Sequence, residues 1–347
     1  MYGAINLMKM IEQRKILSIG DSFAVTLPKQ WSRANALKKG DVVSIKIQRD
    51  KTLNIIPGHV IHERKRELHL LIDVNEDRRS IVRSIIAGFL DGYNSIKLTS
   101  KEFFSAEQLR AIREITSRLY MMITESEAGR IAIETLLDET KTTITTSVER
   151  MHMITYSMCK DLLSSLQNEN LNLAKTVVSF EDDVDNLMFL ILRLIRLAAI
   201  QPSLANQYGL DPIDCLDIQT LVHRIERIAD HVIIIAKSYI WLIENDTSIP
   251  ENLLSIIIRA AEIAFSSYNQ SVESFLLKDV SHTNEIINKE SEMEELYMKI
   301  TPMPYLYDNE NESSSLTQLV LIRESIRKIS HYSADIAELT INRTYQS

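Results

Sequence analysis

The chain has 347 residues and a formal net charge of −8 at pH 7. This length exceeds what one hydrophobic core usually organises, so we expect a multidomain protein. Its 45% hydrophobic and 25% charged residues are typical of a folded globular protein and exclude a largely disordered one. The only cysteines, Cys159 and Cys215, form no C-x-x-C pair, which argues against a disulfide framework and for a cytoplasmic protein. The most apolar runs contain Arg or Lys and fall short of about 18 residues, so we do not expect a membrane-spanning protein.

Charge is distributed unevenly along the chain. Residues 1–57 hold ten Lys or Arg against four acids, whereas residues 140–347 hold 17 against 29. Residues 58–139 are close to balance, with 12 bases and 14 acids. A basic N-terminal segment ahead of an acidic C-terminal segment indicates separate partners for the two ends of the molecule.

The first segment, residues 1–57, predicts a small β unit. The runs "RKILSI" (14–19), "DVVSIKI" (41–47) and "LNII" (53–56) are rich in β-branched residues and are separated by Gly-Asp turns. Pro28 stands where it can open a short helix between the strands. A unit of this size buries too little apolar surface to fold alone, so we expect either a homodimer or a covering partner domain.

This segment resembles the AbrB/MazE-like (SpoVT-type) swapped-hairpin domain. The motifs that carry the resemblance are Gly20-x-Ser22, Leu27-Pro28 and Leu37-x-x-Gly40-Asp41. The resemblance implies two interlocked chains and, in many relatives, binding to DNA. The candidates for contacts with the phosphates of a DNA operator are Arg14, Lys15, Lys29 and Arg33. Asp21 stands where DNA-binding relatives often carry Asn, so a module that only dimerises is the alternative.

The second segment, residues 58–139, predicts a small α/β domain. "ELHLLIDV", "SIKLT", "YMMITE" and "RIAIETLL" read as strands, and two amphipathic helices separate the first three. We expect Asn75 to be the N-cap of the first helix. No glycine-rich phosphate loop follows either early strand, so no motif supports nucleotide binding. The role that remains is a spacer or a ligand-sensing platform.

The third segment, residues 140–347, predicts an all-α bundle. The expected helices are 141–168, 171–200, 212–246, 250–279, 281–300 and 314–343. Six helices in two sets of three indicate a duplicated three-helix bundle.

Two acidic patterns recur between the halves of this segment. "EDDVDNLMFLI" from Glu181 aligns with "ESEMEELYMKI" from Glu290, and "IERIADHVIIIA" from Ile225 aligns with "IRKISHYSADIA" from Ile326. The acid pairs four residues apart are Glu181 with Asp185, Glu226 with Asp230, and Glu290 with Glu294. The position that matches the Glu226 pair in the second half holds Arg327 and His331.

Carboxylates four residues apart share one helix face and repel each other. If the two helices of the first half pack side by side, their four carboxylates converge on one patch. Clustered carboxylate oxygens suit hard cations such as Mg²⁺, Ca²⁺ or Mn²⁺, and with an occasional His they also hold iron. The alternative is a solvated helix start, which is how we interpret the neighbouring Asp182 and Asp183.

Residues 140–347 resemble the PhoU family through "EDDVD" ahead of an apolar helix and "ERIADH" on the next helix. The resemblance implies a duplicated bundle with a multinuclear cluster of divalent or iron-type metal ions on its surface. By this resemblance the metal ligands of the first repeat are Glu181, Asp185, Glu226 and Asp230. The candidates in the second repeat are Glu290, Glu294 and His331, although the basic side chain of Arg327 opposes a cation there.

PhoU relatives are regulators rather than enzymes, and they act through a phosphate transporter and, in some cases, its sensor kinase. The leading hypothesis is therefore a non-enzymatic homodimer that regulates phosphate uptake, binds metal and controls transcription through its head. Two alternatives stay open: a carboxylate-bridged metalloenzyme, and an antitoxin-like DNA-binding module with a scaffold bundle. The Glu-x-x-His spacing of "ERMH" (149–152) has no second copy, so we interpret it as a surface segment rather than half of a di-iron site.

Overall fold

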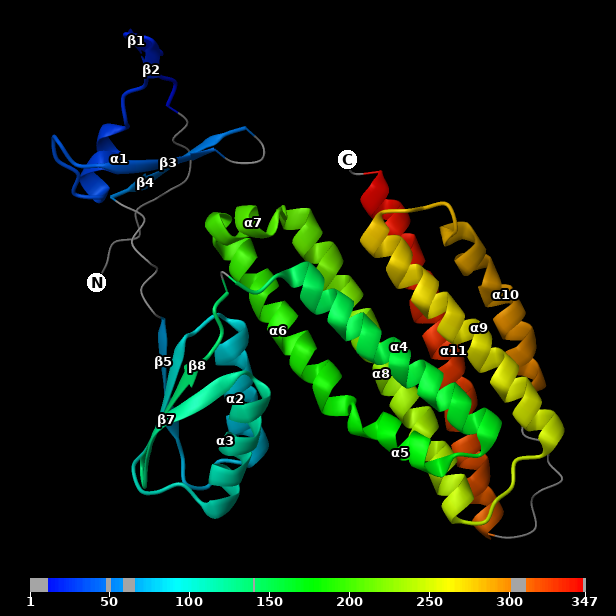
Figure 1. The fold of residues 1–347 in the computed structure, drawn as a ribbon. Helices are drawn as coiled ribbons and strands as arrows, with labels where there is room; N and C mark the ends of the chain where they lie inside the picture. Colours follow the sequence, from blue (N-terminus) through cyan, green and yellow to red (C-terminus); the bar gives the residue numbers. More distant parts are fainter. Residues whose placement is uncertain (1–11, 48–50, 59–65, 140, 301–309, 346–347) are drawn as a thin grey trace. The chain divides into compact units, whose positions relative to one another are not determined.

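The computed structural model describes residues 12–47, 51–58, 66–139, 141–300 and 310–345. It divides the chain into two compact units, Met1–Arg64 and Lys65–Ser347. The second unit holds a four-stranded α/β part followed by a helical bundle (Figure 1). The predicted class, a multidomain α+β protein with a β head, an α/β middle and a helical bundle, is confirmed.

The head (residues 12–47 and 51–58) consists of two antiparallel hairpins and a short helix. Its elements are β1 (Leu17–Ile19), β2 (Ser22–Ala24), α1 (Lys29–Ala34), β3 (Val43–Ile47) and β4 (Leu53–Pro57). Gly20 has a φ of 59°, a left-handed conformation that glycine adopts without strain, and it closes the turn between β1 and β2. Pro28 stands immediately before α1, as the sequence predicted.

None of the residues described in the head is buried within a single chain. Phe23 is 82% exposed, and Ile19 and Ile47 are 66% and 74% exposed. The other exposed apolar side chains are Ile16, Leu17, Val25, Val42, Ile45 and Leu53. A single copy of the head therefore lacks a hydrophobic core, as the small size of the segment predicted.

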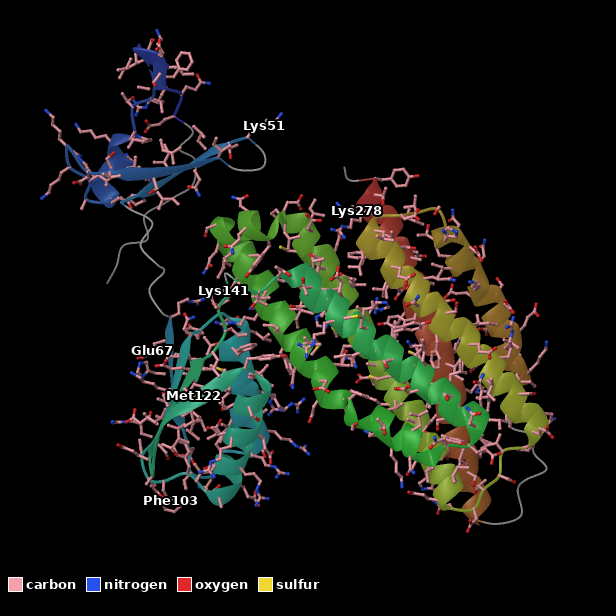
Figure 2. All side chains as sticks on the ribbon, in the orientation of Figure 1. Lys51, Glu67, Phe103, Met122, Lys141 and Lys278 are labelled. Carbon is pink, nitrogen blue, oxygen red and sulfur yellow. The ribbon has the colours of Figure 1, made fainter. Side chains whose placement is uncertain are left out.

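The α/β unit (residues 66–139) is a four-stranded sheet with two helices on one face. Its elements are β5 (Glu67–Ile72), α2 (Arg78–Leu90), β6 (Ser95–Ser100), α3 (Ala106–Arg118), β7 (Met121–Glu127) and β8 (Arg130–Thr135). The strand order is β5-β6-β8-β7, with β5 parallel to β6 and the other pairs antiparallel. Helices α2 and α3 lie side by side and bury Ile81, Phe89 and Ile112 against the sheet (Figure 1). Phe103 and Met122 remain exposed on this unit (Figure 2).

The N-cap expected for the first of these helices is wrong. Helix α2 is capped by Asp77, whose carboxylate accepts a hydrogen bond from the backbone N–H of Arg79 at 3.1 Å. Asn75 lies in the preceding turn and donates its backbone N–H to Asp73 at 2.9 Å. Asn and Asp are nearly equal as N-caps, so the path of the loop decides which of them takes the position.

The bundle (residues 141–300 and 310–345) contains long helices in the order that the sequence predicted. They are α4 (Ile144–Asn168), α5 (Leu171–Ser179), α6 (Glu181–Ile200), α7 (Pro202–Tyr208), α8 (Pro212–Glu244), α9 (Glu251–Leu277), α10 (Thr283–Lys299) and α11 (Glu310–Thr344). Helix α8 packs against α4, α5 and α6 from the first repeat and against α11 from the second (Figure 1). None of the helices in the described part of the chain has the length and apolarity to cross a membrane.

Two details of the bundle differ from the prediction. The helix expected over 171–200 is divided at Phe180, whose N–H donates to Val177 in a tighter turn. Because Phe180 keeps helical angles, the apolar pattern continues through the bend and hides it in the sequence. The expected break after residue 200 contains α7, which starts at Pro202 and is capped at its C-terminus by Gly209, where φ is 69°.

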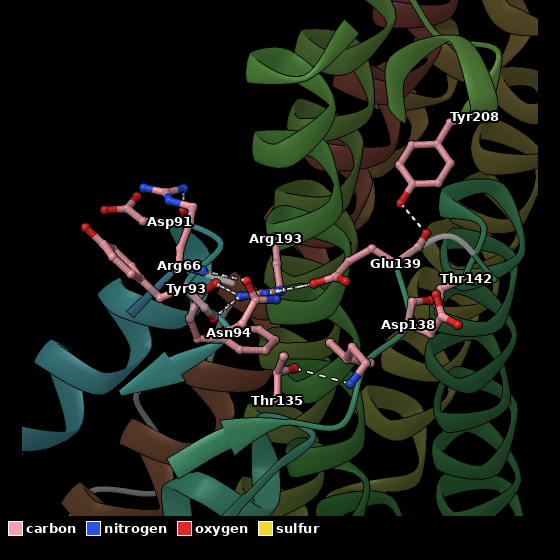
Figure 3. Close-up of polar contacts among 12 residues, drawn as sticks. Arg66, Asp91, Tyr93, Asn94, Thr135, Asp138, Glu139, Thr142, Arg193 and Tyr208 are labelled. Atoms are coloured by element: carbon pink, nitrogen blue, oxygen red, sulfur yellow. Dashed lines mark hydrogen bonds and ion pairs between the residues drawn. The ribbon is translucent and has the colours of Figure 1, made fainter. Parts of the chain in front are cut away.

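The α/β unit and the bundle meet at Arg193 on α6, which is fully buried. Its Nη2 contacts Glu139 Oε1 at 2.7 Å, and its Nη1 donates to the carbonyls of Phe89 and Tyr93 (Figure 3). The guanidinium also lies 4.8 Å from the centre of the Phe89 ring. Tyr208 donates to the carbonyl of Glu139 at 2.7 Å, so the connecting segment is held from the bundle side as well. A buried charge with this set of partners fixes the junction between the two parts.

Candidate metal centre and basic head

The four carboxylates predicted for the first repeat lie on two packed helices. Glu181 and Asp185 are on the first two turns of α6, and Glu226 and Asp230 are one turn apart on α8. Burial raises the pKa of Asp185, Arg118 opposes that shift, and the negative charges of Asp230 and Glu181 add to it. Acids from both helices therefore act on one another through their charges.

Glu226 is the most perturbed carboxylate of this group. Its side chain is 14% exposed, and burial raises its pKa to about 7. Asp230 contributes to this rise through its charge and a hydrogen bond, and Asp185 contributes through its charge. Two carboxylates in hydrogen-bond contact need either a shared proton or a cation between them. A positive charge beside Glu226 would therefore stabilise its carboxylate form, which burial disfavours.

Basic side chains surround the carboxylates. Arg118, at the end of α3, contacts Asp182 at 2.9 Å and Asp185 at 3.0 Å. Lys237 contacts Glu181 at 3.0 Å. The remaining contacts are those of Arg227 with Asp230 at 3.3 Å and with Glu226 at 3.5 Å. Asp182 and Asp183 are exposed, in line with their interpretation as a solvated helix start.

In the second repeat, Glu290 and Glu294 contact side chains of α11. Glu290 lies 3.0 Å from His331 Nδ1, and Glu294 lies 3.2 Å from Arg327 Nε. These four side chains line a cavity of about 410 Å³. An arginine inside the cavity opposes a cation there, so these residues do not fit a metal ion.

The four candidates of the first repeat are all carboxylates, and one of them, Glu226, is deeply placed, which suits a hard cation. Arg118, Lys237 and Arg227 nevertheless contact these carboxylates, so a cation would have to displace them. In the conformation described, however, no three His, Cys, Asp or Glu side chains among the described residues surround a common point. A bound ion would need Asp185, Glu226 and Asp230 to turn toward one another.

The four basic candidates of the head are differently placed. Arg14 forms an ion pair with Glu12, so its positive charge is already compensated. Lys29 and Arg33 are exposed and lie one turn apart on α1. Lys15 is exposed just before β1. Lys15, Lys29 and Arg33 form no ion pair with any residue that the structure describes, so three of the four candidates remain available to an anion.

Sequence reasoning missed the basic partners of the acids. Arg118 and Lys237 come from other elements, and no local spacing links them to α6. The interpretation of "ERMH" as a surface segment is wrong for His152, which is buried and lies 3.0 Å from the hydroxyl of Tyr268 on α9. His152 follows Val148 and Met151 on the buried face of α4, and that apolar spacing could have revealed it.

Comparison with known proteins gives matches at both ends of the chain. The model of the PhoU domain matches residues 148–239 and 257–340, which together make up half of the chain and cover both repeats. The model of the MazE antitoxin domain, described as antidote-toxin recognition, matches residues 16–60. The phosphate-specific transport system accessory protein PhoU homolog of Clostridium acetobutylicum is 20% identical over 195 residues, which span 55% of this chain and 86% of that protein.

Two solved structures match part of the chain. The phosphate transport system regulatory protein PhoU from Streptococcus pneumoniae has 18% identity and a TM-score of 0.47, over 59% of this chain and 94% of that one. PhoU from Pseudomonas aeruginosa has 17% identity and a TM-score of 0.46, over 59% of this chain and 96% of that one.

Proposed function

The chain belongs to the PhoU domain family, and from that premise we propose that it is a non-catalytic regulator of phosphate uptake and phosphate homeostasis. The observation that supports this function is the match of the family model to both three-helix repeats. The similar protein from Clostridium acetobutylicum carries the name of a phosphate transport accessory protein, which fits the same role. The partner implied is a component of a phosphate transporter or its sensor.

The first repeat is the metal-binding part of this proposal. Asp185, Glu226 and Asp230 hold the ion, and Glu181 completes the group from the start of α6. The raised pKa of Glu226 supports the assignment, because a carboxylate that is buried beside other acids gains most from a cation. A bound metal would supply positive charge to carboxylates that belong to α6 and α8. The second repeat, with Arg327 and His331 on its acids, holds no ion.

The head is the dimerising and DNA-contacting part. Its exposed apolar side chains need a cover, and a second copy of the same head supplies one of matching shape and chemistry. Dimerisation also doubles the surface that carries Lys15, Lys29 and Arg33. These side chains contact the phosphates of an operator, so affinity falls as salt rises.

The function is tested in cells that lack the gene. Removal is expected to alter both phosphate uptake and the transcription that responds to phosphate. Reintroduction of Lys29→Glu/Arg33→Glu should restore control of uptake but not of transcription. If removal changes neither response, the proposed function is wrong.

The metal assignment is tested by elemental analysis of protein purified without chelator. Asp185→Ala/Asp230→Ala is expected to lose the bound metal, whereas the matched pair Glu290→Ala/Glu294→Ala should keep it. Metal retained in the first double variant, or lost equally in both, would contradict the assignment.

A further inference from the structure

A groove between α2 and α3 of the α/β unit concentrates arginine side chains. It has a volume of about 410 Å³, within the range of small-molecule sites. Its lining residues are Arg78, Arg79, Val82, Arg83, Glu107, Arg110, Ala111, Glu114, Ile115 and Arg118. Five arginines against two glutamates give the groove a net positive charge, although the chain as a whole has a net charge of −8.

Most of these arginines make no polar side-chain contact with the described part of the chain. Arg78, Arg79, Arg83 and Arg110 are exposed and form no ion pair and no side-chain hydrogen bond with a residue that the structure describes. Arg79 and Arg83 stand one turn apart on α2, where like charges repel by a few tenths of a kcal/mol. A surface that brings unpaired like charges together is unfavourable for folding and favourable for an anion.

Both helices contribute arginines to the lining of the groove. Arg79 and Arg83 are on the wall formed by α2, and Arg110 is on the wall formed by α3. The lining also includes Ala111 and Ile115, which are buried. A ligand in the groove therefore meets guanidinium groups from both helices together with apolar side chains.

We propose that this groove binds a small molecule that carries two or more phosphoryl groups. The planar fork of arginine matches phosphate oxygens through two parallel hydrogen bonds, and charge-assisted bonds of this kind are the strong ones. Several arginines spaced along two helices require several negative charges, which one orthophosphate does not provide. The recognition uses side chains instead of a glycine-rich loop, so the absence of that loop is no obstacle. The site does not depend on the function proposed above.

Arg118 links the groove to the candidate metal centre. It lines one end of the groove and also contacts Asp182 and Asp185 on α6. A phosphoryl group near Arg118 competes with these carboxylates for the guanidinium. Ligand binding in the groove therefore alters the charge around Asp185.

The test is calorimetric titration of the full-length protein at physiological salt, with pyrophosphate as the probe. Tripolyphosphate and ATP test longer and base-bearing ligands, and orthophosphate and citrate test fewer charges and carboxylates. Arg79→Gln and Arg110→Gln remove one arginine from each wall. Arg113→Gln is the matched control, because Arg113 is an exposed arginine of α3 that does not line the groove. Circular dichroism checks that each variant is folded.

Pyrophosphate is expected to bind more tightly than orthophosphate and citrate. Each groove variant should weaken it at least about tenfold, the loss expected for one charge-assisted hydrogen-bonded contact, and the control should change it less than twofold. Tighter binding of ATP than of tripolyphosphate would identify a nucleotide, and the reverse order an inorganic polyphosphate; both support the proposal. No binding of any probe, equal binding of citrate, or equal loss in Arg113→Gln would overturn it.

Discussion

Replacement of Glu226 by glutamine is expected to stabilise the metal-free protein at pH 8 and to stabilise it much less at pH 5. The folded protein raises the pKa of Glu226 to about 7 because the side chain is buried beside Asp230 and Asp185. In the unfolded chain the same group titrates near ~4.3. Between these values the folded state holds a proton that the unfolded state has lost, so stability falls as pH rises through this window.

The size of the effect follows from the shift. One pKa unit corresponds to about 1.4 kcal/mol, so the full difference sets an upper limit of about 3 to 4 kcal/mol. Because Glu226 titrates under the influence of its charged neighbours, we expect the measured gain of Glu226→Gln to be about 1 to 3 kcal/mol at pH 8. At pH 5 the folded protein keeps Glu226 neutral, and this pH lies only ~0.7 units above the pKa of the unfolded chain, so the gain should be at most about 1 kcal/mol.

The assay is urea unfolding followed by far-UV circular dichroism, with chelator present, at pH 5 and pH 8. Glu294→Gln is the control, because its carboxylate is 52% exposed and pairs with Arg327 at the surface. Loss of that pair should reduce stability by at most about 1 kcal/mol, without a gain at pH 8. If Glu226→Gln is no more stable than wild type at pH 8, or is equally stabilised at both pH values, the account of the acidic group is wrong.

Three further predictions concern the rest of the molecule. Arg193→Met should lower the free energy of unfolding in urea by about 3 to 5 kcal/mol, because it leaves buried acceptors unpaired. Arg196 is 56% exposed, so Arg196→Met should change this free energy by at most about 1 kcal/mol. Equal effects of the two substitutions would refute the role of burial. If the head dimerises as proposed, Phe23→Lys should lower the mass from that of a dimer to that of a monomer in light scattering coupled to size exclusion, and an unchanged mass would contradict the covering of this side chain by a second copy. Gly92→Ala should lower the thermal midpoint, because Gly92 has a φ of 81° and an added Cβ would collide with Leu197; a midpoint equal to wild type would show that the turn adapts.

The sequence predicted the helices, the repeats and the acid pairs because each depends on spacing within one element. Glu226 and Asp230 are four residues apart, so their common face follows from helix geometry alone. The ion pair of Arg118 with Asp185 joins residues 67 positions apart, and no spacing rule reaches that far. It depends on how the α/β unit packs against α6.

The same limit applied to buried groups. Arg193 was noticed only as a charge within an apolar run, and its burial against Glu139 could not be inferred from that run. The sequence shows that the arginines of the groove are present, but their convergence in space depends on the packing of α2 beside α3.

The Arg193 junction has a consequence for how this protein arose. Domains that recombine as independent modules usually meet through surfaces that remain soluble when the partner is removed. Here the bundle places an arginine whose acceptors belong to the α/β unit and the segment that follows it. A bundle inherited without that unit would carry this arginine without its acceptors. We therefore expect relatives that lack the α/β unit to have another residue at the position of Arg193, and relatives that possess the unit to carry arginine there together with an acid at the position of Glu139.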